Sequence, residues 1–267
     1  MRSRYYIVCL ACIVLNACNQ HPANIGTKSV PTDTLNYTYQ TIKKRADDCG
    51  NKPDTGCTTA AIMYPVFTAQ KLLNDSIKNK LLQIFSFGDQ EKKDTSLDQL
   101  AQSVITSYQA DTGAVHNKVP YTLDLSAKVL RQGSSLVVLE LGGYAFSGGA
   151  HGGEQTLFVN WNTSSGKQLS LDDLFINGYK VQLNAIAEKI FRKDEKLGAT
   201  DSLGNYFFDK GKFSLNDNFE IMPAGLSFLY NEYEIKSYAE GQTTLFIPYT
   251  QIKSLLRPKT VVSQYIK

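Results

Sequence analysis

A glycine-rich stretch with the sequence YAFSGGAHGGEQ, residues 144–155, contains His151, one of three histidines in a chain of 267 residues. Six glycines fall between positions 142 and 153. The stretch could be a phosphate-binding loop with a catalytic histidine, a loop that faces another ligand, or a turn between two strands. The residue types around it distinguish these interpretations.

The spacing gives catalysis little support. A phosphate-binding loop opens a helix and carries Lys-Ser or Lys-Thr, whereas Gly-Gly-Ala-His-Gly-Gly lies between two strand-like segments. A zinc site usually takes at least two histidines, and no two of His21, His116 and His151 stand at i, i+4. Ser147 keeps a serine–histidine dyad open, although no G-x-S-x-G motif is present. Carboxylate pairs for glycan hydrolysis stay open as well, since spacing cannot locate them among 25 acidic residues.

The glycines indicate a backbone requirement first. Glycine adopts positive φ and lets two backbones approach closely, as a bulged or strongly curved hairpin requires. In that interpretation His151 forms hydrogen bonds that hold the turn. The competing interpretation is a ligand-facing loop, in which small residues expose backbone donors beside Tyr144, Phe146 and His151.

The N-terminus has the features of a bacterial lipoprotein. Arg2 and Arg4 precede an apolar run that is shorter than the roughly 20 residues needed to span a bilayer. The run ends in Leu-Asn-Ala-Cys, which resembles a lipobox, so we predict a signal peptide over residues 1–17 and acyl chains such as palmitate on Cys18. Acyl chains anchor a protein because each buried methylene contributes about 0.8 kcal/mol.

Residues 18–34 are polar and contain proline, as expected of a tether between lipid and domain. The expected location is therefore the cell envelope, with the chain bound to a membrane through the lipid on Cys18. In a Gram-negative cell we expect the outer membrane, facing the periplasm, because Asn19 is not the aspartate associated with retention in the inner membrane.

Two further cysteines, Cys49 and Cys57, bracket the turn-rich segment CGNKPDTGC. In an oxidising compartment such a pair predicts a disulfide that closes the tip of a hairpin. A two-thiolate metal site is the alternative, although no histidine lies nearby.

The charge balance disfavours nucleic acid as a partner. Loss of the predicted signal peptide removes two arginines and no acidic residue, leaving 26 basic against 25 acidic residues. The chain has no basic block to supply the counterion release on which nucleic-acid affinity depends.

Apolar spacing predicts an α+β fold in which helices pack on antiparallel sheet, as two closely associated subdomains. The subdomain boundaries are placed at 35–115 and 116–267. Pro65 indicates an edge strand or the end of a strand. Thr95, with Asp98 three residues later, indicates the N-terminus of a helix. The predicted helices are 69–86, 97–108 and 180–193, with a helical turn at 169–175, and the predicted strands lie within 35–67 on either side of the cysteine turn and at 121–129, 136–141, 156–161, 219–222, 225–230 and 242–249.

Five motifs occur in an order that is familiar from one family. They are Tyr-Pro at 64–65, GGAHG at 148–152, GKQLSLDDLF at 166–175, YNEYEIKSYAEG at 230–241 and Ile-Pro-Tyr at 247–249. Together they resemble the extracytoplasmic domain shared by the anti-sigma factor RsiV and the N-terminal region of the peptidoglycan deacetylase PdaC. The resemblance covers most of 35–257.

The resemblance implies an α+β module with helices packed on antiparallel sheet. In RsiV that module binds lysozyme, and in PdaC it accompanies a separate catalytic domain. This sequence contains no histidine-rich deacetylase motif, and it has Glu232 and Ser237 where the family tends to have prolines.

We therefore expect a lipid-anchored binding lipoprotein with no catalytic residue, metal or cofactor of its own. Lysozyme-like hydrolases or peptidoglycan fragments are the expected partners. The candidate contact residues are Tyr144, His151, Tyr233 and Tyr238, because tyrosine is enriched at interfaces and both residue types have polar tips. Packing within the core or sheet is the alternative for each tyrosine. A cell-wall glycan or peptide hydrolase and a structural envelope component remain the alternative functions.

Overall fold

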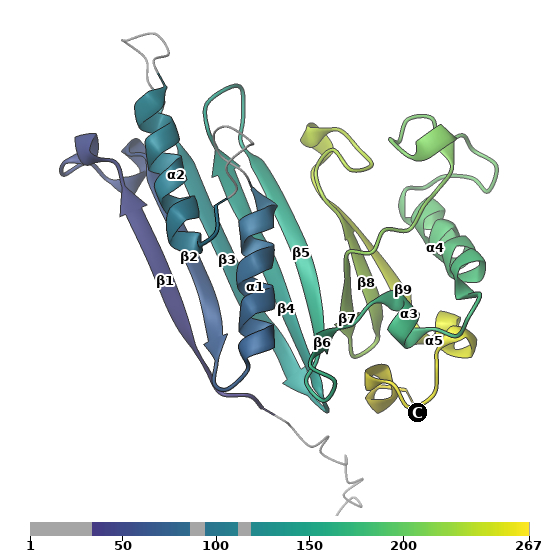
Figure 1. The fold of residues 1–267 in the computed structure, drawn as a ribbon. Coiled ribbons are helices and arrows are strands. Elements are labelled where there is room, and N and C mark those ends of the chain that lie inside the picture. The colour runs from purple at the N-terminus through teal and green to yellow at the C-terminus, as the bar shows by residue number, and fades with distance from the viewer. Residues whose placement is uncertain (1–33, 86–93, 112–118, 267) are drawn as a thin grey trace, which may run out of the picture.

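The computed structural model describes residues 34–85, 94–111 and 119–266 (Figure 1). The predicted signal peptide, the lipidation site Cys18 and nearly all of the tether lie outside these residues, as does His116. Within the described ranges no helix is both long and apolar enough to cross a membrane.

Six strands form one sheet in the order in which they occur along the chain. One face of this sheet is covered by two amphipathic helices, α1 (Lys71–Ile84) and α2 (Leu97–Ala110) (Figure 1). Both bury their apolar stripes, including Leu73, Ile77 and Val104, against the inward residues of the strands. The strands are β1 (Tyr37–Arg45), β2 (Thr59–Phe67), β3 (Thr122–Gly133), β4 (Leu136–Phe146), β5 (Gly153–Asn162) and β6 (Lys167–Gln168).

A second, three-stranded sheet follows, with its own hydrophobic core. Its antiparallel strands are β7 (Phe219–Met222), β8 (Gly225–Tyr230) and β9 (Thr243–Pro248). They pack with α4 (Tyr179–Asp194) and the short helices α3 (Leu171–Leu174) and α5 (Tyr249–Ile252) (Figure 1).

The predicted fold class is confirmed, and three details differ from expectation. β2 and β3 pair in parallel, because α1 and α2 form the crossover that returns the chain to the same end of the sheet. The sheets divide the chain after Gln168, whereas the sequence prediction placed a subdomain boundary at 115–116. Ser96 caps α2 by accepting a bond from Gln99 N at 3.2 Å, in place of the predicted Thr95.

Pro65 lies inside β2 and beyond its pairing with β3, which ends at Met63. The residue therefore interrupts no ladder on that side, although β2 itself is an interior strand.

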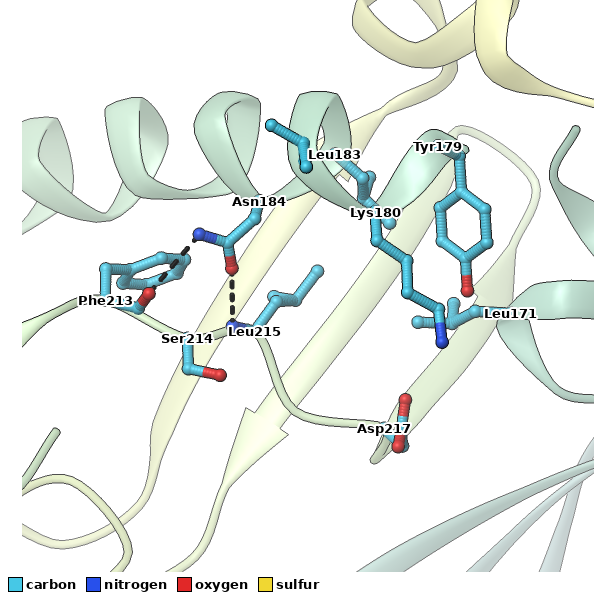
Figure 2. A pocket seen from close by; sticks show the side chains of 10 residues that line it. Leu171, Tyr179, Lys180, Leu183, Asn184, Phe213, Ser214, Leu215 and Asp217 are labelled. Carbon is cyan, nitrogen blue, oxygen red and sulfur yellow. Dashed lines mark hydrogen bonds between the residues drawn. The ribbon is translucent and has the colours of Figure 1, made fainter. Parts of the chain in front are cut away.

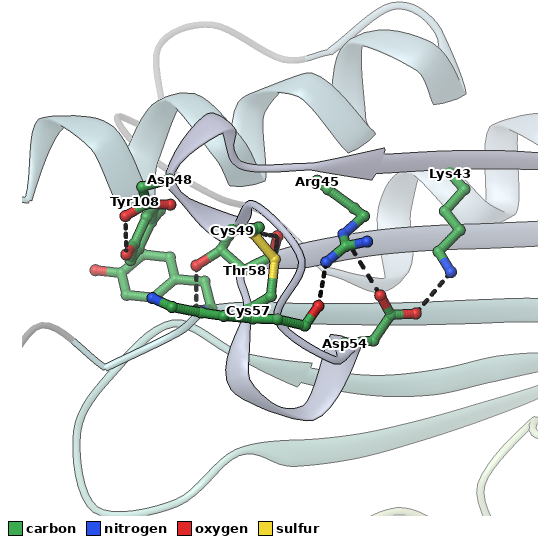
Figure 3. The surroundings of a disulfide bond; sticks show 10 residues. Lys43, Arg45, Asp48, Cys49, Asp54, Cys57, Thr58 and Tyr108 are labelled. Carbon is green, nitrogen blue, oxygen red and sulfur yellow. Dashed lines mark hydrogen bonds and ion pairs between the residues drawn. A yellow bond between two sulfur atoms is a disulfide. The ribbon is translucent and has the colours of Figure 1, made fainter.

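The predicted disulfide between Cys49 and Cys57 is present at the tip of the β1–β2 hairpin, with 5.3 Å between the two Cα atoms (Figure 3). Both half-cystines are buried, and the Tyr108 hydroxyl on α2 donates to Asp48 at 2.8 Å beside them. The disulfide closes the hairpin tip, and the hydrogen bond from Tyr108 joins that tip to the helix layer. On the outer side of the tip, Lys43 and Arg45 form ion pairs with Asp54.

Side-chain amides join the two sheets along the outer edge of β5. Asn160 donates to Phe219 O at 2.7 Å and accepts from Ile221 N at 2.9 Å, which holds β7. Asn218 donates to Thr156 O at 2.8 Å and accepts from Phe158 N at 2.9 Å. These contacts satisfy backbone groups that an unpaired strand edge would expose.

Candidate functional site at the junction of the two sheets

The four predicted contact residues lie together, although they come from three separate segments. Tyr144 is near the end of β4, His151 is in the β4–β5 loop, and Tyr233 and Tyr238 follow β8. The rings of His151 and Tyr238 are stacked, with centroids 3.8 Å apart and planes 17° apart. Tyr233 stacks beside them, 5.8 Å from Tyr238 and 6.2 Å from His151. We call these four residues the aromatic cluster.

His151 is held by two hydrogen bonds. Its Nδ1 lies 2.8 Å from Gly152 O and its Nε2 lies 3.2 Å from the Tyr233 hydroxyl. A carbonyl oxygen only accepts, so Nδ1 donates to Gly152 O, and Nε2 shares a hydrogen bond with the Tyr233 hydroxyl. Within the described ranges, neither Ser147 nor any carboxylate forms a hydrogen bond with His151. These two hydrogen bonds fix the orientation of the His151 ring, and the residue remains exposed to solvent.

The glycines of the loop meet backbone requirements, as the sequence indicated. Gly148 and Gly149 have φ values of 89° and 94°, a region that side chains disfavour. Gly152 lets the chain cross the Tyr144 ring, because a Cβ atom there would lie 2.3 Å from Cζ of that ring. The loop path and the position of Tyr144 therefore depend on each other.

The segment after β8 is anchored to β5 by polar contacts. Asn231 accepts from Thr156 N at 2.7 Å and donates to Thr156 O at 3.1 Å. Glu232 accepts from Glu154 N at 3.1 Å. Ser237 begins the short 3-10 helix Tyr238–Glu240 with a capping box. Glu232 and Ser237, which depart from the family pattern, thus position the tyrosines on either side of them.

Carboxylates surround the exposed rings. Burial, followed by the nearby Glu232 carboxylate and then by Tyr144 and Glu154, raises the pKa of Tyr238 above the ordinary tyrosine value. The Tyr238 hydroxyl is therefore neutral over the physiological range and can both donate and accept. The cluster combines stacked rings, the neutral Tyr238 hydroxyl and acidic acceptors.

A hollow of about 320 Å³ adjoins the cluster on the face of the six-stranded sheet opposite α1 and α2. Its lining includes Tyr144 and Glu154, which it shares with the surroundings of the aromatic cluster. The other polar residues of the lining carry no signal in the sequence, because only strand register brings them together. They are Asp124, Ser126, Lys128, Glu140 and Thr156.

A second hollow, of about 550 Å³, lies beside α4 and contains none of the predicted residues (Figure 2). Asn184 spans one side of it, donating to Phe213 O at 3.3 Å and accepting from Leu215 N at 3.0 Å. Burial, and after it the hydrogen bond to Asp172, raises the pKa of Tyr179 on another side. Among the described residues, no three His, Cys, Asp or Glu side chains are grouped so as to hold a metal ion.

Two family models match separate parts of the chain. The model described as "Deacetylase PdaC" matches residues 51–154, and the model described as "Protein of unknown function (DUF3298)" matches residues 172–250. The peptidoglycan-N-acetylmuramic acid deacetylase PdaC of Bacillus subtilis (strain 168) is 25% identical over 181 residues. That match covers 64% of this chain and 38% of the relative, so the chain spans well under half of its length.

Crystal structures of two DUF3298 family proteins share the fold. The protein from Bacteroides fragilis NCTC 9343 has a TM-score of 0.69 and 23% identity, covering 88% of this chain and 99% of its own. The protein from Pseudomonas aeruginosa PAO1 has a TM-score of 0.69 and 22% identity, covering 85% and 96%. The predicted resemblance is confirmed by these matches. Tyr144 and His151 fall in the first matched region and Tyr233 and Tyr238 in the second, so the aromatic cluster draws on both.

Proposed function

We propose that this chain, which joins a PdaC-like region to a DUF3298 region, is a binding protein of the cell envelope whose ligand contacts the aromatic cluster. The observation that carries the proposal is the convergence of Tyr144, His151, Tyr233 and Tyr238 at the junction of the two sheets. Tyr233 is 57% exposed despite its aromatic ring. His151 is exposed as well, and Tyr144 and Tyr238 are half-buried, so the cluster presents apolar faces and polar tips to a ligand.

Peptidoglycan fragments are the ligand class that we favour. Aromatic faces pack against the C–H face of a sugar ring, and carboxylates accept hydrogen bonds from its hydroxyls. The printed name of the Bacillus subtilis relative concerns the same polymer. A lysozyme-like hydrolase, a cationic protein, is the second candidate partner, supported by the carboxylates around the cluster.

We further propose that the lipid on Cys18 holds the chain in the envelope, facing the periplasm from the outer membrane if the cell is Gram-negative. The supporting observation is the sequence Leu-Asn-Ala-Cys at residues 15–18, which resembles a lipobox. Replacement of Cys18 by Ser removes the thiol that takes the lipid, so the protein should leave the membrane fraction or accumulate unprocessed. Unchanged processing and fractionation would contradict the anchor.

Calorimetry on the full chain in detergent tests the binding proposal, with muropeptides and lysozyme as separate ligands. We expect saturable binding of muropeptides that Tyr233→Ala weakens. Phe207→Ala is the matched control, because Phe207 is 56% exposed and lies outside the cluster. Saturable binding of lysozyme alone would reassign the partner, and binding unaffected by Tyr233→Ala would refute the cluster as the site.

A hydrolase remains the second candidate, because the name of the relative is that of an enzyme and His151 is hydrogen-bonded beside carboxylates. Mass spectrometry of muropeptides incubated with the protein tests it. Turnover that His151→Ala abolishes and Phe207→Ala leaves intact would replace the binding proposal. If the protein shows neither binding nor turnover, the result favours a structural envelope component.

A further inference from the structure

The hollow beside the aromatic cluster is built from rows of side chains across β3, β4 and β5. The strand register places Asp124, Tyr144 and Glu154 opposite one another in the first row. The second row is Ser126, Gly142 and Thr156, and the third begins with Lys128 and Glu140. Alternate residues of a strand point to the same face, so all three rows line the face opposite the helices.

Gly142 forms the floor of this hollow. A Cβ atom at Gly142 would lie 2.2 Å from Gln155 O, so the close approach of β4 and β5 excludes every larger residue. The middle row therefore has hydroxyls from Ser126 and Thr156 at its sides and no side chain at its centre. Opposite strands lie about 4.8 Å apart, which leaves roughly 10 Å between the flanking side chains. That span accommodates one sugar ring.

The charges around the hollow are unbalanced. Lys128 and Glu140 form an ion pair of 3.2 Å at one end. At the other end, neither the Asp124 nor the Glu154 side chain has a hydrogen-bond or ion-pair partner in the described part of the chain. Glu232 lies outside the lining of the hollow and accepts from the backbone N–H of Glu154 at 3.1 Å, so it brings a third carboxylate to that edge of β5. Glu154 and Glu232 both act electrostatically on Tyr238, so negative charge is concentrated on the β5 side of Tyr144, with Asp124 alone on the β3 side.

We propose that this hollow binds an amino-sugar unit that carries a free, protonated amine, and that it selects such units over their N-acetylated forms. The inference rests on the proposed glycan-binding function and adds its ligand class. The ammonium group lies against Glu154, with the Glu232 carboxylate beyond it at the edge of β5, and the tyrosine faces there also favour a cation. Asp124, Ser126 and Thr156 bond the hydroxyls of the ring, and Tyr144 bounds the ring at one end.

An N-acetylated unit fits this arrangement less well. Its nitrogen is uncharged, so Glu154 gains no charge-assisted hydrogen bond when the amide displaces water from it. An amide also adds three heavy atoms beyond the nitrogen, on the side where Tyr144 and the β4–β5 loop approach each other. Selection therefore depends on the β5 side of the hollow, and general affinity for the ring depends on the β3 side.

The test is calorimetry on the full chain with a glucosamine tetrasaccharide and its N-acetylated counterpart, at about pH 6 where a free amine is protonated. We expect the amino form to bind roughly fivefold to tenfold more tightly, because exposed charge pairs contribute modestly. Glu154→Gln should bring this ratio close to one. Asp124→Asn should weaken both forms to a similar degree and preserve the ratio. Asp75→Asn, an exposed acid on α1 across the sheet, should change neither.

Each other outcome overturns the inference. Equal affinity of the wild-type chain for both tetrasaccharides would refute selection of the amine and leave the glycan-binding proposal in place. A preference for the amine that persists in Glu154→Gln would place its site elsewhere. Binding of lysozyme that Glu154→Gln weakens, with neither tetrasaccharide bound, would make the hollow a contact for a cationic protein. Failure to bind any of these ligands or muropeptides would refute the proposed function as well.

Discussion

Replacement of Gly152 by Ala should disrupt the aromatic cluster from within. The added Cβ would lie 2.3 Å from Cζ and from the hydroxyl oxygen of Tyr144, and 2.5 Å from its Cε2. Either the Tyr144 ring rotates away or the loop that carries His151 moves outward. Both responses separate rings that the wild-type chain holds together, so the variant should lose order at the cluster and affinity for a ligand that binds there.

The size of the effect follows from overpacking. Forcing an extra methyl group into a packed site destabilises the fold by about 1–3 kcal/mol. Replacing Gly by Ala also lowers the entropy of the unfolded chain, which offsets about 0.4–1 kcal/mol of this loss. The net loss should be about 1–2 kcal/mol in the free energy of unfolding. For a chain of this size, that corresponds to a fall of about 2–8 °C in Tm.

The neighbouring glycine provides a matched control. A Cβ at Gly153 would meet only the Glu232 carboxylate, at an ordinary contact distance of 3.9 Å. The free energy of unfolding of Gly153→Ala should therefore lie within about 0.5 kcal/mol of the wild-type value. Urea unfolding and near-UV circular dichroism of the tyrosines measure both variants. In a Tyr144→Ala background the clash is absent, and Gly152→Ala should lose most of its effect. The reasoning is refuted if Gly152→Ala and Gly153→Ala have the same stability and spectrum.

Three further predictions concern the scaffold. Asn160→Ala breaks two buried hydrogen bonds between β5 and β7 and should cost about 2–4 kcal/mol, measured by urea unfolding; a loss below about 0.5 kcal/mol would contradict this role. Replacing both Cys49 and Cys57 by Ala should cost about 2.5 kcal/mol in the chain-entropy model, and reductant should then have no effect on Tm. Burial, followed by the hydrogen bond to Glu195, raises the pKa of Tyr206 to about 12, so its stabilisation is complete below about pH 10 and is lost as the pH rises to about 12. Tyr206→Phe should therefore be less stable at neutral pH and decline less steeply across that range; an unchanged slope would refute the assignment.

The helices could be predicted from the sequence because their signals are local. Apolar residues at helical spacing predicted 69–86, and the structure has a helix at Lys71–Ile84. The helical turn predicted at 169–175 is likewise present as α3, which begins with a capping box of Ser170 and Asp173. Such signals depend on residues within one or two turns, so no tertiary contact is needed to read them.

The pairing of distant strands could not be predicted in the same way. Asp124 and Glu154 are separated by 30 positions, and only the register through Tyr144 places them in one row. Period-2 alternation shows which residues share a face of one strand, but it carries no information on how strands align with each other. The parallel pairing of β2 with β3 was missed for the same reason, since it follows from a crossover over the sheet.

The aromatic cluster forms only where the two matched regions contact each other. His151 reaches Tyr233 across 82 positions of sequence, and the segment carrying Tyr233 is held to β5 by Asn231 and Glu232 through hydrogen bonds. A ligand that contacts rings from both regions binds only the conformation in which the segment carrying Tyr233 packs against β5. By mass action the ligand then stabilises this packed conformation by RT ln(1 + [L]/Kd), which is about 2.7 kcal/mol when the free ligand concentration is a hundred times Kd. Backbone amides of β5 at the junction should therefore exchange more slowly with solvent deuterium when the ligand is present, whereas those of β1, at the far edge of the sheet, should not change.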